Sequence, residues 1–566
     1  MILFSKLFRK LFYFLLITID IVVILFIWFI CTITIHPPHT EQTAIVDLQR
    51  KKIAPDFYTL QQSWIKKSET GLWEIYVEGN GFERGVIEGK LNKELAEKQE
   101  IAFVNQIKKM IPSQGMLHYL KFFISFFNRN LDHYIPEEYK LEIYGESLYA
   151  SDQFDFIAPK YYRMLNYHAA HDIGHALQDK NMTVGCTAFG VWGNRSSDTS
   201  LLIGRNFDFY VGDEFAEDKL INFVNPSEGY KLMMISWAGM IGTVSGMNEK
   251  GLTVTINASK SEIPTSAATP ISIVAREILQ YAKNIEEAFA IAQKRKTFVS
   301  ESILIGSQVD GRTATIEKTP SKTELYDPQK TDYIICANHY QGNAFLNDAI
   351  NRVNIEKSSS DYRRRHLDQL IQEHPVMDIK TAASILRNQQ GMDKKNIGMG
   401  NEKALNQLIA HHSVIFKPAK LQVWVSTNPF QLGPYVCYDL NRVFKVAPGL
   451  AEKKEIYEKE LTVAADPFLF SQQYKKFNAY KQMKEAFQYA HVHNVKFLAD
   501  DNVIKKFINC NPEYFETYVV LGQYYKDQHQ TEIALRYFSK ALTKEITTVQ
   551  DKEAIEKNIQ EIKAIH

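Results

Sequence analysis

The chain has 566 residues, of which 45% are hydrophobic and 23% are charged, and its formal net charge is +1. This length is more than one hydrophobic core usually organises, so two or three domains are expected. The near-zero net charge leaves no excess of basic groups to neutralise phosphates, which argues against nucleic acid as a partner. The five cysteines form no CxxC pair, which argues against a disulfide framework and a zinc-finger pattern.

Residues 1–40 are predicted to be a cytoplasmic stub followed by a transmembrane signal anchor. The apolar run from Leu11 to Ile35 is longer than the roughly 20 residues that a helix needs to span a bilayer. Basic residues precede the run and none follows it before Arg50, so the positive-inside rule keeps the N-terminus cytoplasmic and exports the remainder. A cleaved signal peptide is the alternative, although the run is long for one and no small-x-small site follows it.

Residues 41–185 are expected to form a largely helical pro-region with one strand-like segment, Leu72–Glu78. The glycine-rich segment Gly79–Gly89 lacks the GxGxxG and GK[ST] patterns of nucleotide-binding loops. One helical face of the region could present three histidines to a zinc ion: His168, His171 and His175. Because no HExxH pattern accompanies them, we expect no metal and no other cofactor.

Strand-like segments predominate from Cys186 to about residue 448, with helical stretches between them. The clearest helical stretches are Ile271–Arg295, Asp361–Gln372 and Ile379–Gln389. Strands and helices that come in blocks, without strict alternation, indicate an α+β fold with layered sheets.

Residues 449–566 read as a helical, lysine-rich tail. Six residues fit the spacing of a tetratricopeptide repeat: Tyr518, Leu521, Gly522, Tyr525, Ala534 and Phe538. A generic helical hairpin with apolar stripes is the alternative. Either interpretation gives the tail a surface for a protein partner.

Cys186 and the residues that follow it have the pattern of a nucleophilic site. Gly-Cys-Thr begins a predicted strand, and Gly-Arg-Asn-Phe-Asp follows at Gly204–Asp208. Hairpin spacing is expected to bring Arg205 and Asp208 back beside the cysteine. A thiolate is a strong nucleophile, and a neighbouring cation lowers its pKa, while a carboxylate can orient an amine that acts as the base. An ordinary ion pair at a strand end is the alternative for Arg205 and Asp208.

Five segments in chain order resemble the N-terminal nucleophile (Ntn) cysteine hydrolases, and among them the self-cleaving isopenicillin-N acyltransferase family. These segments are Gly79–Gly89, Gly185–Thr187 with Gly204–Asp208, Trp237–Leu252, Ala337–Tyr340 and Ser360–Arg363. Acid ceramidase, N-acylethanolamine acid amidase and the bile salt hydrolases are related to that family. The resemblance covers roughly residues 70–440 and implies a four-layer αββα fold.

The resemblance also implies that Cys186 is the nucleophile and cuts the Gly185–Cys186 peptide bond itself. The α-amino group that this exposes has an unperturbed pKa of about 7.7 to 8.0, which suits a base near neutral pH. Arg205 and Asp208 would hold the thiolate and the amine.

The oxyanion donors implied by the resemblance are Asn257 and Asn338, and Arg363 would orient them or bind substrate. Either asparagine could instead be a turn residue. Arg363 lies in an Arg-Arg-Arg run that a solvated helix face would also explain, and Arg364 is an alternative equivalent.

These features predict a self-cleaving hydrolase or acyltransferase that acts on linear, non-peptide or peptide-like C–N amide bonds at the outer side of a membrane. The expected substrate is an N-acyl small molecule or a lipid-like amide, because the enzyme is anchored. Hydrolysis and acyl transfer share an acyl-enzyme and differ only in the acceptor. The alternative is a non-catalytic, membrane-tethered scaffold that binds partners through its tail, but a scaffold has no need of a thiol beside Arg205 and Asp208.

Overall fold

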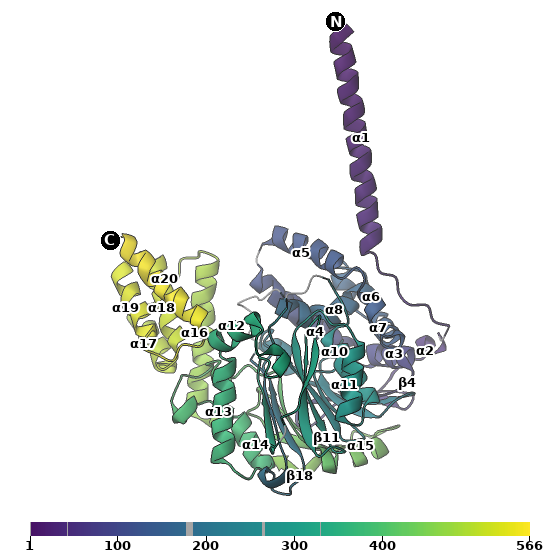
Figure 1. The fold of residues 1–566 in the computed structure, drawn as a ribbon, viewed down its shortest axis with the longest axis vertical. Coiled ribbons are helices and arrows are strands. Elements are labelled where there is room, and N and C mark those ends of the chain that lie inside the picture. Colours follow the sequence, from purple (N-terminus) through teal and green to yellow (C-terminus); the bar gives the residue numbers. More distant parts are fainter. Residues whose placement is uncertain are drawn as a thin grey trace.

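The computed structural model describes residues 2–41, 43–111, 113–176, 185–262, 266–328 and 330–565. Within these residues two β-sheets pack face to face, and helices cover the outer face of each (Figure 1). The expected mixed α+β class, with an apolar N-terminal helix and a helical C-terminal region, is confirmed.

The larger sheet has eleven strands in the part of the chain that is described. Their order is β1 (Lys51–Ala54), β2 (Phe57–Leu60), β3 (Ser63–Lys67), β4 (Trp73–Gly79), β7 (Leu220–Pro226), β8 (Leu232–Ser236), β9 (Ser245–Asn248), β10 (Leu252–Ala258), β11 (Glu301–Ser307), β12 (Arg312–Lys318) and β13 (Thr323–Tyr326). Strands β4 and β7 pair in parallel, whereas the other neighbours in this sheet pair antiparallel.

The smaller sheet is antiparallel and begins its chain path immediately after Cys186. Its order is β14 (Tyr333–Cys336), β5 (Thr187–Val191), β6 (Leu202–Phe207), β15 (His412–Lys417), β16 (Gln422–Ser426), β17 (Tyr435–Asp439) and β18 (Glu458–Val463). Because β18 lies beyond residue 448, this sheet continues into the segment that the sequence predicts to be a helical tail.

Three apolar clusters hold the layers together. One packs the larger sheet against α3 (Gly81–Leu91), α7 (Glu137–Ser147), α8 (Lys160–Ala176), α10 (Ile271–Tyr281) and α11 (Ile285–Lys294). A second fills the space between the sheets, and a third packs the smaller sheet against α13 (Ser360–Glu373) and α14 (Ile379–Leu386). The shorter or more peripheral helices are α2 (Ala44–Asp47), α4 (Lys93–Met110), α6 (Leu131–Tyr134), α9 (Asp213–Glu217), α12 (Ala349–Lys357) and α15 (Leu440–Val446).

Helix α1 (Ile2–Ile33) projects from the rest of the protein as a single long helix (Figure 1). Its segment Phe8–Ile33 contains an 18-residue window with a mean hydropathy of 2.9, and the segment is long and apolar enough to cross a membrane. Near its end, Phe29 stacks on Phe126 of α5 (Gln114–Phe127), with ring centroids 6.0 Å apart. Helix α5 also exposes large apolar side chains, including Tyr119 and Phe123.

The region before Cys186 contributes more strands than the sequence indicated. Besides β4, residues 51–67 form β1, β2 and β3, so the expectation of a largely helical pro-region is incomplete. One reason is that Lys66 interrupts the apolar pattern of β3 and yet is buried, where its Nζ lies 2.6 Å from Glu74 on β4. A lysine in that position predicts a solvent-facing side chain, because lysine is rarely buried without a partner of opposite charge.

The Gly79–Gly89 segment is explained by close helix packing. Asn80 and Glu83 form a capping box at the start of α3. On the face toward α7, a Cβ added at Gly81, Gly85 or Gly89 would collide with the α7 backbone. The glycines therefore let two helix backbones approach more closely than larger residues would allow.

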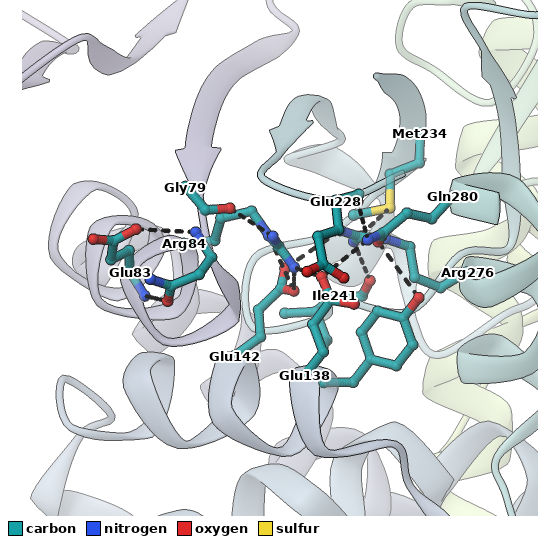
Figure 2. Close-up of polar contacts among 12 residues, drawn as sticks. Gly79, Glu83, Arg84, Glu138, Glu142, Glu228, Met234, Ile241, Arg276 and Gln280 are labelled. Carbon is teal, nitrogen blue, oxygen red and sulfur yellow. Dashed lines mark hydrogen bonds and ion pairs between the residues drawn. The ribbon is translucent and has the colours of Figure 1, made fainter. Parts of the chain in front are cut away.

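A buried charge cluster contains residues that precede the predicted cut site in the sequence and residues that follow it (Figure 2). Arg84 of α3 lies 2.8 Å from Glu138 and 2.5 Å from Glu142, both on α7. Helix α10 follows Cys186 in the sequence. Its Arg276 Nη2 lies 3.5 Å from Glu142, and its Gln280 donates to Glu138 at 2.9 Å. The cluster and the β4–β7 pairing join residues before Cys186 to residues after it without using the peptide bond at the cut.

The tail consists of α16 (Gln472–Val492), α17 (Asp501–Cys510), α18 (Phe515–Asp527), α19 (Thr531–Ala541) and α20 (Val549–Ile565), with an apolar core of its own. Gly522 of α18 lies against the ring of Phe538 on α19, as in a tight helical hairpin. The assignment of this hairpin to the tetratricopeptide type stays a prediction.

We expect Glu142→Gln to lower the free energy of unfolding by roughly 3–5 kcal/mol, because it leaves the buried guanidinium groups of Arg84 and Arg276 without their shared carboxylate. Chemical denaturation of the full chain measures this. Glu137→Gln on the same helix is the control, since its pair with Lys140 is at the surface and should change the value by less than about 1 kcal/mol. Equal effects of the two substitutions would contradict the prediction.

Candidate active site

The hairpin of β5 and β6 brings Arg205 and Asp208 beside Cys186, as the spacing predicted. Arg205 lies opposite Ala188 in the strand register, and its Nη2 donates to Cys186 Sγ at 3.8 Å. The backbone oxygen of Asp208 accepts from the Cys186 thiol at 3.9 Å and from the Gly185 amide at 3.2 Å. The two residues of the predicted scissile bond are therefore both held by Asp208.

The Arg205 guanidinium is fixed by buried acceptors from the larger sheet. Its Nη1 donates to Ser245 Oγ at 2.5 Å and to Val244 O at 3.3 Å, and its Nη2 also donates to Ile256 O. Burial lowers the pKa of Arg205, partly offset by Cys186 and Asp208. These contacts hold the cation against the cysteine.

Burial favours the neutral forms of both the thiol and the carboxyl of this site. It raises the pKa of Cys186 to about 11, although the charge of Arg205 acts in the opposite direction. It raises the pKa of Asp208 to about 7, offset by the charges of Arg363 and then Arg205. Among the described residues, neither carboxyl oxygen of Asp208 has a hydrogen-bond partner. In the uncut chain Cys186 is thus a protonated, buried thiol.

Arg363 reaches the junction from α13. Its Nη1 donates to the backbone oxygens of Gly185 at 2.6 Å and Cys186 at 2.7 Å, and to Thr187 Oγ1 at 2.8 Å. Arg364, the other arginine considered, pairs with Asp361 at 3.0 Å and is partly exposed. Of the two, only Arg363 contacts the junction.

The two asparagines lie near this junction but donate to backbone oxygens in the uncut chain. Asn257 Nδ2 donates to Cys336 O at 2.9 Å and to Ala337 O at 3.2 Å. Asn338 Nδ2 donates to Ala258 O at 2.8 Å, while its Oδ1 accepts from Arg363 Nη2 at 2.7 Å. Arg363 thus orients Asn338, and neither amide contacts the Gly185 carbonyl.

Several residues of the site gave no usable signal in the sequence. Gln407, from a loop far along the chain, donates from Nε2 to Gly185 O at 2.8 Å. His412 on β15 bonds to Ser245 Oγ at 2.8 Å and, through Nδ1, to Nδ1 of His411 at 2.9 Å. Only tertiary packing brings these groups to the hairpin, since no local motif marks them.

The histidines considered for zinc do not form a described metal site. Nδ1 of His168 lies 2.8 Å from Met164 O, and its Nε2 accepts from the Ile241 amide at 3.0 Å. The side chains of His171 and His175, and residues 177–184 before the junction, lie outside the described residues. Within those that are described, no group of three or more His, Cys, Asp or Glu residues is arranged to hold a metal.

Residues 194–429 match the model of a family described as acyl-coenzyme A:6-aminopenicillanic acid acyl-transferase. Over this segment the chain is similar to that acyltransferase family. The resemblance inferred from the sequence motifs is therefore confirmed. The matched segment begins after Cys186 and includes Arg205, Asp208, Asn338 and Arg363. No curated protein matches the chain in sequence.

Solved structures are also similar to parts of this chain. A Caenorhabditis elegans N-acylethanolamine-hydrolyzing acid amidase ortholog is 15% identical over 41% of this chain and 93% of its own, with a TM-score of 0.30. A mutant of the Clostridium perfringens conjugated bile acid hydrolase is 15% identical over 48% and 96%, with a TM-score of 0.31. Penicillin V acylase from Agrobacterium tumefaciens is 15% identical over 45% and 87%, with a TM-score of 0.30. In each comparison more than half of this chain has no counterpart.

We expect the stability of the uncut chain to fall as the pH rises toward 7, because of Asp208. Its pKa is raised from 3.8 to about 7 in the folded chain, so between these values the folded state binds more protons than the unfolded state. This group lowers the free energy of unfolding by up to about 1.4 kcal/mol per pH unit in that window and has no further effect above it.

The measurement compares denaturant unfolding of Cys186→Ala with that of Cys186→Ala/Asp208→Asn from pH 4.5 to pH 8. Both chains lack the thiol and stay uncut. The second should lose part of the pH dependence, and parallel curves would show that Asp208 titrates normally.

Proposed function

We propose that the chain is a self-cleaving cysteine Ntn hydrolase or acyltransferase that acts on N-acyl amide bonds at the outer side of a membrane. The observation that carries the proposal is the buried junction itself. The Cys186 thiol faces Arg205, while the carbonyl of the preceding residue is held by side-chain donors. A structural cysteine needs neither.

Self-cleavage is an attack of Cys186 Sγ on the carbonyl carbon of Gly185. The S–C bond forms as the C–N bond to Cys186 breaks, and the thiol proton moves to the departing amine nitrogen. Water then hydrolyses the thioester, which gives a carboxylate on Gly185 and restores the thiol. The new N-terminal amine lies in the neighbourhood of Asp208, whose carboxylate would pair with it as an ammonium ion.

In the mature enzyme this amine would act as the base that takes the proton of the Cys186 thiol. Asp208 would orient the amine, and Arg205 would stabilise the thiolate. Asn257 and Asn338 would donate to the oxyanion of a bound substrate once their backbone acceptors had moved. The acyl-enzyme is then released to water or to an amine acceptor.

The proposed architecture is a four-layer αββα Ntn-hydrolase fold with four parts. These parts are the stub and anchor at 1–40, the pro-region at 41–185, the catalytic core at 186–448 and a tetratricopeptide-like tail at 449–566. Cleavage leaves the anchor on the N-terminal piece. That piece would remain bound because it supplies β1 to β4 of the larger sheet and Arg84, Glu138 and Glu142 of the buried charge cluster.

The membrane assignment depends on α1 and α5 together. Helix α1 is suited to span a bilayer, and the basic residues before its apolar segment would keep the N-terminus in the cytoplasm. Helix α5 lies beside the end of α1 and exposes Met116, Tyr119 and Phe123, which lie at helical spacing on one face. The body of the protein would therefore sit close to the outer surface of the lipid.

An aromatic cavity that begins at Phe209, the residue after Asp208, would take the acyl group of the substrate. Its lining includes Phe103, Tyr167, Phe209, Phe215 and Trp237. Phe209 follows Asp208 directly and stacks on Trp237, with centroids 6.2 Å apart. The exposed surface of the cavity is mostly apolar, although Lys93, Glu97, Glu100 and Glu146 also line it, and this favours a hydrocarbon acyl chain.

The first test is N-terminal sequencing of the purified full-length protein and of its Cys186→Ala variant. We expect a new chain that begins at Cys186 in the wild type, while the variant stays intact because it lacks the nucleophile. Both pieces of the cut protein should elute together from a sizing column. A wild type that stays uncut at acidic and neutral pH would instead favour the scaffold interpretation.

The cavity assignment predicts that Trp237→Ala discriminates between acyl lengths. The probes are N-acyl-7-amino-4-methylcoumarins with acetyl to hexadecanoyl groups. We expect kcat/KM to fall roughly tenfold or more for the long acyl groups and to change little for acetyl, since only the long chains lose apolar contacts. Phe156→Ala, which removes an exposed aromatic side chain, is the control. A uniform loss across all lengths would argue against the cavity as the acyl site.

A further inference from the structure

The carbonyl oxygen of Gly185 accepts two side-chain hydrogen bonds. Arg363 Nη1 donates at 2.6 Å and Gln407 Nε2 at 2.8 Å. Both side chains are buried, so the bonds form away from bulk water. A Cβ at residue 185 would collide with the side-chain amide of Gln407, so a larger residue there would displace this donor.

This is the oxygen that becomes negatively charged when a thiolate adds to the Gly185 carbon. Donors at about 2.7–3.1 Å that are already in place stabilise such a charge without reorganisation. Asn257 and Asn338 do not serve this oxygen, because their N–H groups donate to other carbonyls. Self-cleavage and substrate turnover would therefore use different oxyanion donors.

We propose that Gln407 is a catalytic hydrogen-bond donor in self-cleavage and that the C-terminal helices position it. The inference rests on the proposed function, because it concerns the cut before Cys186. It also gives the tail a role, through the loop that runs from Gly398 to Leu408.

The two residues beside Gln407 anchor this end of the loop. The backbone N–H of Asn406 donates to Asn388 O at 2.8 Å. Leu408, on the other side, is buried in a cluster with Phe477 of α16. Gln407 is thus placed between a contact to the catalytic core and a contact to the tail.

The rest of the loop is held by the tail directly. Asn511, which follows α17, bonds to both backbone groups of Met399, at 3.0 Å and 2.8 Å. Glu545, between α19 and α20, lies 2.6 Å from both Lys395 and Lys403. A Cβ at Gly398 would collide with Tyr514, so the loop and the tail are in close contact. A displaced tail would therefore displace Gln407.

The test measures the first-order rate of self-cleavage after pulse-labelled synthesis of the full chain in lipid nanodiscs. We expect Gln407→Met, which keeps the volume but removes the donor, to slow cleavage by roughly 10²- to 10³-fold. Gln431→Met is the matched control, because Gln431 is a buried glutamine that bonds Leu386 O at 3.4 Å and does not contact the junction. It should cleave within about threefold of the wild type.

Melting temperatures of the three chains show whether they are folded. If Gln407→Met does not fold, Gln407→Asn replaces it, because that amide is one methylene too short to reach the carbonyl and should also cleave slowly. Cleavage of a folded Gln407 variant at the wild-type rate overturns the proposal and leaves the proposed function intact. A wild type that does not cleave refutes both.

The positioning role of the tail is tested by Glu545→Gln, which loses the ion pairs to Lys395 and Lys403. We expect it to slow cleavage about three- to tenfold in the wild type and to have no further effect in Gln407→Met, because both changes act through one contact. Glu561→Gln, which loses a pair with Lys526 within the tail, is the control. Slowing by the same factor in both backgrounds would overturn this role.

Discussion

The buried guanidinium of Arg363 is the interaction on which the site depends. It joins α13 to the start of β5 by donating to the backbone oxygens of Gly185 and Cys186, and it orients Asn338. A buried cation is costly unless its N–H groups are satisfied, so the neighbouring oxygens must stay where they are. Its charge also opposes the effect of burial on the pKa of Asp208. The geometry of the junction therefore depends on the acceptors that Nη1 and Nη2 of this side chain require, while its Nε has no hydrogen-bond partner among the described residues.

The uncut chain has the properties of a closed precursor. Cys186 is buried, and burial raises its pKa, so a free thiolate is scarce at neutral pH. The nearby carboxyl of Asp208 lacks a hydrogen-bond partner among the described residues. Breaking the Gly185–Cys186 bond would create an amine that Asp208 can hold. Such a cleavage would therefore pair the carboxylate of Asp208 with a positive charge.

The cut would separate the chain without separating the fold. Strand β4 lies before Cys186 and β7 after it, and the two pair along their whole length within one sheet. The charge cluster of Arg84, Glu138, Glu142 and Arg276 also spans the two sides. Sheet hydrogen bonds and a buried charge cluster together replace the missing peptide bond.

Much of this protein follows from local sequence. The apolar run predicts α1, because the mean hydropathy of about twenty residues can be evaluated without knowing any tertiary contact. The spacing of Cys186, Arg205 and Asp208 gives their contact, since a hairpin brings nearby residues together. The glycines of Gly79–Gly89 mark a close helix contact, although the partner helix could not be known.

Tertiary structure alone decided the rest. It placed Arg363 and not Arg364 at the junction, because the two differ only in which face of α13 they occupy. It made Lys66 a buried strand residue by supplying Glu74. It brought Gln407 to Gly185 across 222 positions of sequence through a loop that the tail helices hold. Such contacts depend on the packing of whole layers, and no short stretch of sequence contains that information.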